Sequence, residues 1–420
     1  MTHLRPRDGT ESQRTTTAEL FFDLVYVFAI TQLSHLLLDH LSFGSAAQAT
    51  FLLLVVWWAW IYTTWMTNWF DPNSPSVRFV LTGAMLASLL LAASLPQAFG
   101  ENGLLFAAAY VVLQVGRNFA AMSLLERDHR LRDVYQRVLL WSIASGALWL
   151  AGAALDSDHR LSLWLPALLL DLLAPVAGYW LPGRGRATTS DYDIEGGHFT
   201  ERCQLFILIA LGESIVVAGG TAADGGLTPT TLVSLAVAFL ETAALWWLYF
   251  GTPAEQLRAA VISSENPGRL ARDAYTYAHV LIVGGIVATA AANNLLLAAP
   301  REPAHGTDLA VLLGGPALYL LGLGLFQWMT TGRFVKKAVV GAALVIASIP
   351  FGHHLPVLAL ASAMTLLLAA LAVWELGSWR AERSRSLDRG WTSDPSSEGS
   401  QRGAGVRPGS GRHRRAASVR

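Results

Sequence analysis

The sequence predicts an all-α fold: a polytopic transmembrane helical bundle. Of the 420 residues, 53% are hydrophobic and only 14% are charged, whereas soluble domains carry about 25% charged residues. Apolar runs of about 20 residues, the length of a helix that crosses a bilayer, recur along the whole chain. Basic residues are also distributed unevenly between alternate loops. These three observations place most of the chain in a lipid bilayer.

The apolar runs predict twelve spans. The polar residues 1–16 precede the first run, which lacks a small-residue cleavage site and is expected to be retained as a helix. The ninth run is long enough to tilt or break, and the eleventh is short. The twelve spans are expected at 17–38, 47–69, 77–97, 103–124, 134–155, 161–181, 199–219, 228–250, 272–298, 308–328, 337–351 and 355–377.

The loop charges predict the orientation of these spans. Of the 30 Lys and Arg residues, 27 fall at the termini or in loops on one side. Arg160 and Arg301 fall on the other side, and Arg117 lies within a span. Because Lys and Arg concentrate on the cytoplasmic side of membrane proteins, we expect both termini in the cytoplasm. The basic residues are 28 Arg and 2 Lys, and the chain is rich in Ala, Leu and Gly, as in proteins of GC-rich bacterial genomes, so we expect it in a bacterial plasma membrane.

The chain divides into three regions. Residues 1–16 form a predicted cytoplasmic segment, and residues 17–378 form the membrane domain. Residues 379–420 are rich in Ser, Gly and Arg, and such a composition predicts a disordered basic tail.

A weak internal repeat suggests two parallel six-helix halves. Trp57-Trp58 is followed by Tyr62, and Trp246-Trp247 is followed by Tyr249. The halves would cover about 17–181 and 199–377. Two parallel halves related by an axis along the membrane normal are a known transporter plan.

Two carboxylates occupy the start of the first span. Glu19 and Asp23 are four residues apart and therefore share one helix face. One interpretation is an entry site for cations or protons. The other is that the carboxylates pair with Arg residues of neighbouring helix ends, which we favour for Glu19 and weigh equally for Asp23. Asp23 should face the interface between the halves, with Leu24 and Val27 on the opposite face.

Further ionisable residues lie in later spans, where they are costly unless protein or water receives them. Arg202 and Glu213 are eleven residues apart on one helix face, about 16 Å along its axis, and cannot pair directly. We expect Arg117 to be the partner of Glu213, either as a structural ion pair or as a gated one. Glu201 and His279 complete the candidate pathway or gating residues, His279 being the residue most easily explained as a hydrogen-bonded interior histidine.

The sequence lacks signals for cofactor chemistry. Its histidines show no metal-ligand spacing, and it has neither a P-loop nor a Gly-rich dinucleotide motif. The single cysteine, Cys203, excludes an intrachain disulfide. We therefore expect no metal, no cofactor and no nucleic-acid partner, and no catalytic residue is assigned.

Two stretches identify a family resemblance. "ELFFDLVYVFAITQLSHLL" at 19–37 and "DYDIEGGHFTERCQLFILIALGESIVVAGG" at 191–220 resemble signatures of the bacterial low-temperature-requirement A family. "NWFDP" at 68–72 and "YTYAHVLIVGGIVATA" at 275–290 fit the same family. The resemblance covers all predicted spans and implies a polytopic bacterial membrane protein without an established molecular activity. It places weight on Glu19, Phe22, Asp23, His198, Glu201, Arg202, Gly212, Glu213 and Ser214.

The first span is also similar to that of potassium channels with a Phe-Ser-Asp motif, which have six plus six spans. Phe21-Phe22-Asp23 stands at the motif, with Phe22 in place of the serine. Thr17 stands where that family has an arginine. Both differences fall at positions that belong to the gating network in those channels.

These observations leave two classes of function. The first is a secondary transporter or channel for a small solute or cation. The second is a scaffold, a sensor or a membrane-bound enzyme. A transporter should contain a hydrated cavity near the bilayer midplane, whereas a scaffold should have a dry core with every charge paired.

The charge asymmetry makes a topology prediction. Reporter fusions at the N-terminus, residue 190 and residue 390 should all report a cytoplasmic location, and fusions at residues 100 and 224 an external one. A cytoplasmic signal at residue 224 would contradict the twelve-span arrangement.

Overall fold

The computed structural model describes residues 3–6, 14–39, 42–127, 129–188, 194–251, 260–261, 264–332 and 336–391. These residues form helices joined by loops, with three isolated β-bridges and no longer strand among them. The all-helical fold class is therefore confirmed. The chain forms two compact units, Met1–Glu375 and Leu376–Arg420. Part of the predicted tail, 379–391, is helical, and 392–420 lies outside the described residues.

The helices follow the order of the predicted spans. They are α1 (Thr17–Asp39), α2 (Phe43–Trp69), α3 (Pro75–Ser94), η1 (Leu95–Gln97), α4 (Gly103–Val111), η2 (Val112–Gly116), α5 (Arg117–Ser123), α6 (Arg130–Ala153), η3 (Ser157–His159), α7 (Leu161–Leu173), α8 (Gly196–Asp224), α9 (Pro229–Phe250), α11 (Pro267–Leu270), η5 (Ala271–Ala278), α12 (His279–Ala298), α13 (Thr307–Thr331), α14 (Lys336–Gly352) and α15 (Val357–Trp391).

Nine helical segments in the described part of the chain are long and apolar enough to cross a membrane. The other three predicted spans fold as α6, α7 and α14. Helix α6 begins with several charged residues, and α14 has only 17 residues. Helix α7 is 13 residues long and ends at Leu173, not at residue 181 as expected. The chain turns after Pro175, where Gly178 and Tyr179 adopt positive φ angles. Twelve crossings therefore stay a prediction.

The ninth predicted span contains the irregularity that its length suggested. The segment starts at Pro267 and passes through a π-helical stretch, η5, before α12 begins. The side chains of Thr276 and His279 bond the carbonyl oxygens of Ala271 and Ala274, each five residues earlier. A second π-helical stretch, η2, joins α4 to α5. Such stretches occur frequently at functional sites.

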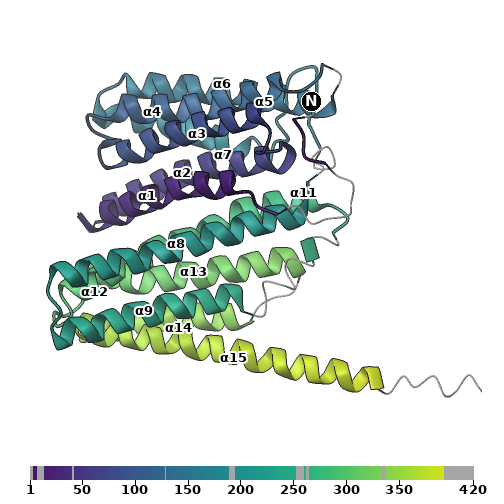
Figure 1. The fold of residues 1–420 in the computed structure, drawn as a ribbon. Coiled ribbons are helices and arrows are strands. Elements are labelled where there is room, and N and C mark those ends of the chain that lie inside the picture. Colours follow the sequence, from purple (N-terminus) through teal and green to yellow (C-terminus); the bar gives the residue numbers. More distant parts are fainter. Residues whose placement is uncertain are drawn as a thin grey trace, which may run out of the picture. The chain divides into compact units, whose positions relative to one another are not determined.

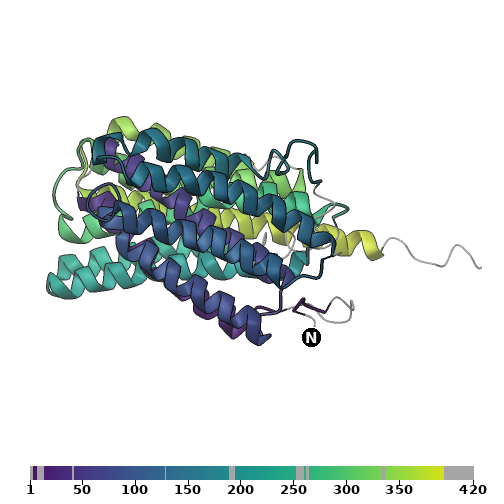
Figure 2. The same cartoon turned by 90° about the horizontal axis from the view of Figure 1, so that it is seen from above.

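The membrane domain has two groups of helices. Helices α3–α7 lie on one side of α1 and α2, and α8, α9 and α12–α14 lie on the other (Figure 1). Helix α1 packs against α8 and α12 at this boundary. Seen from above, the helices run along a common direction (Figure 2), as expected for a membrane bundle.

Three glycines allow the backbones of α12 and α13 to approach closely. A Cβ atom on Gly285 would lie 2.5 Å from the backbone nitrogen of Tyr319. On Gly315 it would lie 2.8 Å from the backbone nitrogen of Thr289, and on Gly322 2.8 Å from that of Ile282. Small residues permit this backbone approach between membrane helices.

This packing predicts different effects for two neighbouring glycines. Gly315→Ala should destabilise the domain by about 1–3 kcal/mol, because the added methyl group meets backbone atoms of α12. Gly314→Ala should have little effect, because nothing lies within 4 Å of its added Cβ. Thermal unfolding of the two purified variants in detergent would measure the difference, and equal melting temperatures would contradict this account of the helix contact.

Candidate functional site

A cluster of buried charges joins the starts of α1 and α8. We call it the α1–α8 charge cluster. It consists of Arg5, Glu19, Asp23, His198 and Arg202, of which Arg5 is 8% exposed and the other four 0%. Its two carboxylates and two guanidinium groups balance each other. Four of its residues, Glu19, Asp23, His198 and Arg202, were singled out in the sequence, and the structure adds Arg5.

Asp23 and Arg202 form a two-pronged salt bridge. Arg202 Nη1 donates to Asp23 Oδ2 over 2.7 Å, and Nη2 donates to Oδ1 over 2.8 Å. The indole nitrogen of Trp60, on α2, donates to Asp23 Oδ1 over 2.7 Å. The Arg202 guanidinium also lies 5.7 Å from the centre of a Trp60 ring. Paired N–H donors in this geometry hold a carboxylate strongly and with a fixed orientation.

Asp23 faces α8 through its salt bridge to Arg202, and the two six-helix halves between which it was expected to lie stay a prediction. Its partner comes from the neighbouring helix, in agreement with the pairing interpretation of the two carboxylates. Leu24, on the opposite face, is 56% exposed, and Val27 is half-buried.

Glu19 is held by the N-terminal segment and by α8. Arg5 Nη2 donates to Glu19 Oε2 over 2.8 Å, and His198 Nε2 lies 2.9 Å from Glu19 Oε1. The backbone nitrogen and hydroxyl of Thr16 also donate to Oε2 over 2.9 Å. The pairing interpretation favoured for Glu19 therefore describes its contacts, although Arg5 precedes the helix instead of ending a neighbouring one.

The hydrogen-bond network assigns the protonation of His198. Asn68 Oδ1 accepts from the backbone nitrogen of Glu195 over 2.9 Å, so Asn68 Nδ2 is the atom that faces His198 Nδ1 over 3.2 Å. Because an amide nitrogen only donates, Nδ1 of His198 must accept and its proton lies on Nε2. His198 is thus a neutral donor to Glu19. Arg5 Nη2 also lies 3.1 Å from His198 Nε2, but both atoms are donors, so Arg5 bonds Glu19 and balances its charge.

The N-terminal segment is part of this structure. Leu4 forms a β-bridge with Phe70, and the Arg5 backbone nitrogen donates to Trp69 O over 2.9 Å. Arg5 Nε donates to Thr67 O over 2.8 Å. Backbone bonds at the end of α2 therefore position the Arg5 side chain between α1 and α8. Arg5 was not assigned a role from the sequence, because the sequence shows only that it precedes an apolar run and not which residues it contacts.

The predicted pair of Arg117 and Glu213 is wrong. Arg117 instead donates to Ala59 O over 3.2 Å, to Thr63 Oγ1 over 3.1 Å and to Gln114 Oε1. Glu213 accepts from Thr31 on α1. The two side chains belong to different groups of helices, and their distance in space could not be derived from their positions in the sequence.

Glu201 and His279 also have identified contacts. Glu201 is half-buried and accepts from the backbone nitrogen of Thr15 over 3.2 Å, at the edge of the charge cluster. His279 donates from Nδ1 to Ala274 O over 3.1 Å, so its Nε2 accepts from Tyr249 over 2.8 Å. His279 is therefore the hydrogen-bonded interior histidine that the sequence favoured.

A second polar network connects Arg117 to Asp171. Asp171 Oδ2 accepts from Tyr110 over 3.0 Å and from Trp149 Nε1 over 3.1 Å. Gln114 donates to the Tyr110 hydroxyl over 2.9 Å and accepts from Arg117. The two buried charges are thus linked through two side chains without a direct contact. Asp171 was visible as a lone carboxylate in an apolar run but was not selected.

Beside Arg117 lies a small cavity that the sequence did not predict. It has a volume of about 60 Å³. Aromatic side chains form much of its wall, namely Tyr62, Trp65, Trp69, Tyr135 and Tyr179. The remaining lining residues are Asn118, Val134, Val138, Pro175, Arg272 and Thr276. The Arg117 guanidinium lies 5.4 Å from the centre of the Tyr62 ring, so the cavity and the second network are adjacent.

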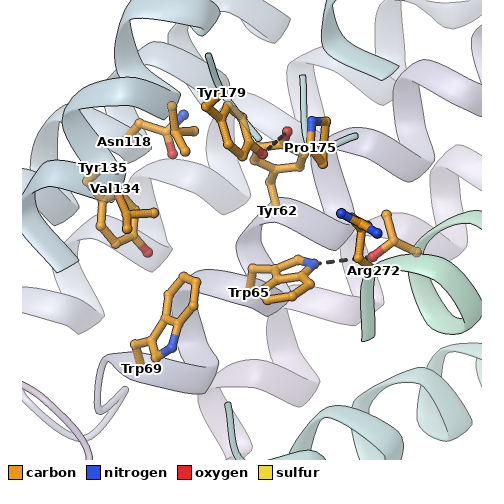
Figure 3. Close-up of a pocket in the computed structure, with 11 residues that line it drawn as sticks. Tyr62, Trp65, Trp69, Asn118, Val134, Tyr135, Pro175, Tyr179 and Arg272 are labelled. Atoms are coloured by element: carbon orange, nitrogen blue, oxygen red, sulfur yellow. Dashed lines mark hydrogen bonds between the residues drawn. The ribbon is translucent and has the colours of Figure 1, made fainter. Parts of the chain in front are cut away.

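Hydrogen bonds fix the aromatic wall. The hydroxyl oxygens of Tyr62 and Tyr179 are 2.6 Å apart, and Trp65 Nε1 donates to Thr276 Oγ1 over 3.2 Å (Figure 3). Two π-helical stretches border the cavity: Thr276 lies within η5, and Asn118 follows η2 by two residues. The described residues contain no group of three or more His, Cys, Asp or Glu side chains arranged to bind a metal ion.

The charge cluster predicts a large effect of neutralising one partner. Asp23→Asn should lower the free energy of unfolding by about 3–5 kcal/mol, because it leaves the fully buried Arg202 without its carboxylate. If Asp23 had only a packing role and no buried cation as its partner, the loss of unfolding free energy would be smaller. Combining Asp23→Asn with Arg202→Gln should recover much of the loss.

Thermal unfolding of the single and double variants would measure this coupling. Glu201→Gln, at the half-buried edge of the cluster, is the control and should be mild. If the double variant is as unstable as the sum of the single variants, the Asp23–Arg202 pair does not act as a unit.

Comparison with known proteins agrees with the signatures in α1 and α8. The family described as bacterial low temperature requirement A protein (LtrA) matches residues 14–373. The chain is 34% identical over 378 residues to the uncharacterized protein RA0937 of Rhizobium meliloti (strain 1021), covering 89% of this chain and 92% of the relative. No solved structure matches the chain significantly. The chain therefore belongs to the bacterial low-temperature-requirement A family.

Proposed function

We propose that this protein moves a small solute across the bacterial plasma membrane and that the aromatic cavity is part of the pathway. The observation that supports the proposal is a cavity lined by polar as well as aromatic groups, within a membrane domain, beside a buried arginine. Ionisable residues inside membrane domains usually face protein or water-filled paths. In the proposed twelve-span topology with cytoplasmic termini, the cavity lies toward the cytoplasmic side.

The network behind the cavity supports a pathway. Arg117 is 3% exposed, and its guanidinium donates to a carbonyl oxygen, a hydroxyl and a side-chain amide oxygen. Its Nε atom is buried without a hydrogen-bond partner. An arginine held in this way keeps its positive charge in the protein interior, where it acts on any solute that enters from the cavity.

The π-helical stretches at the cavity provide a means of movement. A π-helical turn is a local departure from the regular backbone hydrogen-bond pattern, and such turns are frequent at functional sites. The two stretches belong to opposite groups of helices: η5 contributes Thr276 to the cavity wall, and the lining residue Asn118 lies two residues after η2. We propose that changes in these two turns open the path between the groups.

We assign the α1–α8 charge cluster a different role. Each carboxylate oxygen of Asp23 already accepts from Arg202, and Oδ1 also accepts from Trp60. A cation entering at Asp23 would have to displace a buried guanidinium. We therefore propose that the cluster holds the two groups of helices together, and that Glu19, Asp23, Glu201 and Arg202 do not line the path.

The complete pairing of the cluster also favours a second candidate function. A scaffold or sensor would need a rigid, dry connection between helix groups, and the cluster supplies one. Such a protein would bind a ligand in the cavity, or none, without carrying it across the membrane.

Cysteine accessibility separates these functions. Asn118 is 2% exposed and lines the cavity, whereas the adjacent Phe119 is 56% exposed on the outer surface of the bundle. In a Cys203→Ala background, Asn118→Cys should react with a charged, membrane-impermeant thiosulfonate added from either side. Phe119→Cys, which faces lipid, should react slowly from both sides.

Labelling in inverted vesicles and in intact cells would provide the two measurements. A carrier that alternates between two states exposes Asn118→Cys to each side in turn. Labelling from one side alone, or from neither, would contradict transport through this cavity and favour the scaffold or sensor.

A further inference from the structure

Helix α9 carries a buried carboxyl group, Glu241, that belongs neither to the charge cluster nor to the network behind the aromatic cavity. We propose that Glu241 is a proton-binding site, which takes up and releases a proton through the end of the bundle opposite to the charge cluster. Use of that proton to drive transport rests on the proposed function, whereas the site itself does not. In the orientation predicted from the sequence, this end of the bundle is external.

Glu241 is buried without a partner. The residue is 3% exposed, and within the described part of the chain its carboxyl group takes part in no hydrogen bond or ion pair. An ionised carboxylate that is removed from water is very costly unless a cation or hydrogen-bond donors balance it. Asp23 meets this condition through Arg202, and Glu241 does not. The carboxyl group of Glu241 is therefore expected to hold a proton.

Contacts with α12 and α13 define the surroundings of Glu241. The Tyr319 hydroxyl on α13 donates to Leu245 O on α9 over 2.6 Å. On α12, a Cβ atom added to Gly285 would lie 2.5 Å from the backbone nitrogen of Tyr319. Leu245, Gly285 and Tyr319 therefore lie at about the same level of three helices that belong to one group (Figure 1).

A shift of about one helical turn, away from the charge cluster, leads to the next level. Because α12 runs opposite to α9 and α13, this shift reaches Glu241 on α9, Thr289 on α12 and Gly315 on α13. Thr289 and Gly315 are in contact, since a Cβ atom on Gly315 would lie 2.7 Å from Thr289 Oγ1. Glu241, on the buried face of α9, therefore lies at the same level as the Thr289 hydroxyl.

Further buried polar atoms continue from this level. Among the described residues, the Thr289 hydroxyl has no hydrogen-bond partner, and neither has the side-chain amide of Asn293, one turn further along α12. On α9, the Ser234 hydroxyl, two turns beyond Glu241, is also buried without a partner. Buried polar atoms in native proteins are nearly always hydrogen-bonded to protein or to water. These three side chains therefore mark positions at which water can bind between α9 and α12.

The polar positions lead to an open pocket where α8 ends and α9 begins. Thr221 Oγ1 donates to Asn294 Oδ1 over 3.1 Å, and Asn294 follows Asn293 directly. Thr221 is also part of the wall of this pocket, which has a volume of about 780 Å³ and is lined by Asp224 and several threonine hydroxyls. A hydronium ion in the pocket can pass its proton through bound water to the Glu241 carboxylate, which becomes a carboxyl group.

The charges on neighbouring helices leave the proton as the best ligand. The titratable groups on these helices are Glu213 on α8, His279 on α12, Tyr319 on α13, Lys337 on α14 and Glu375 on α15. None of them bonds or pairs with Glu241 in the described part of the chain. Ca²⁺ and Mg²⁺ take about six or more oxygen ligands, whereas a proton needs a single carboxylate oxygen.

Dicyclohexylcarbodiimide, an apolar reagent that adds to protonated carboxyl groups, provides the first test. In the purified full-length protein in detergent, Glu241 should be labelled at neutral pH, as located by peptide mass spectrometry, and the label should be lost as the pH is raised. Asp23, paired with Arg202, should stay unlabelled. Sodium chloride and choline chloride should act alike. A label on Glu241 that does not depend on pH, or protection by Na⁺ alone, would overturn the assignment.

Infrared difference spectra between neutral and alkaline samples provide a second measurement. The band of a protonated carboxyl group should be present in the parent protein and weaker in Glu241→Gln. An unlabelled Glu241, together with equal bands in the two proteins, would also overturn the proton site.

Stability distinguishes a protonated carboxyl group from a paired carboxylate. Glu241→Gln, which replaces the carboxyl group by a neutral amide of the same shape, should leave the melting temperature at neutral pH unchanged. Asp23→Asn, which removes the charge of a paired carboxylate, should lower it. A loss in Glu241→Gln as large as that in Asp23→Asn would mean that Glu241 is ionised and paired.

Ag⁺, a small ion that reacts with thiols, tests the route to Glu241. In the Cys203→Ala background, Ser234→Cys should react with Ag⁺ added at the external side faster than Val233→Cys does. Val233 is the adjacent residue and is 52% exposed on the outer surface of α9. Thiols that remain after exposure are counted by maleimide labelling of the denatured protein. Equal rates, or a faster reaction of Val233→Cys, would contradict the route.

Asn118→Cys separates failure of this inference from failure of the transport proposal. Labelling of Asn118→Cys from both sides, with a Glu241 that does not titrate, would retain transport and overturn the proton site. Labelling from one side, with a Glu241 that titrates, would retain the proton site and overturn transport.

Discussion

The buried salt bridge between Asp23 and Arg202 is the interaction on which the arrangement of the membrane domain depends. It connects the first helix to α8, and Trp60 brings α2 into the same contact. Two full charges without solvent exposure are tolerated only when each is paired and hydrogen-bonded. The pairing thus fixes both the rotation of α1 and its position against α8.

Glu19 extends this constraint to the N-terminal segment. Its carboxylate needs Arg5, and Arg5 is held by carbonyl oxygens at the end of α2. Neutral His198 completes the contact from α8 and is itself oriented by Asn68. Residues from four separate parts of the chain therefore neutralise one buried site, which explains why charged residues can stand at the start of an apolar helix.

The charges near the cavity are arranged differently from those in the α1–α8 charge cluster. In the cluster, every carboxylate has a guanidinium partner, which favours rigidity. Around the cavity, Arg117 is solvated by neutral groups and reaches Asp171 only through Gln114 and Tyr110. Among the described residues, the cluster is thus a direct contact between helix groups, whereas at the cavity Arg117 and Asp171 do not touch and π-helical turns lie nearby.

Apolar runs and loop charges are local properties of the chain, so they suffice to predict a helical membrane protein. The sequence also predicted the order of the helices, a ninth span long enough to tilt or break, and the inward-facing side of α1. It could not predict that Asp23 pairs with Arg202 across 179 positions, that Arg117 and Glu213 stay apart, or that Arg5 returns to Glu19. Five aromatic residues from α2, α6 and the turn after α7 meet at the cavity. Which faces of distant helices meet depends on the packing of the whole domain, and helical periodicity specifies only the residues that share a face.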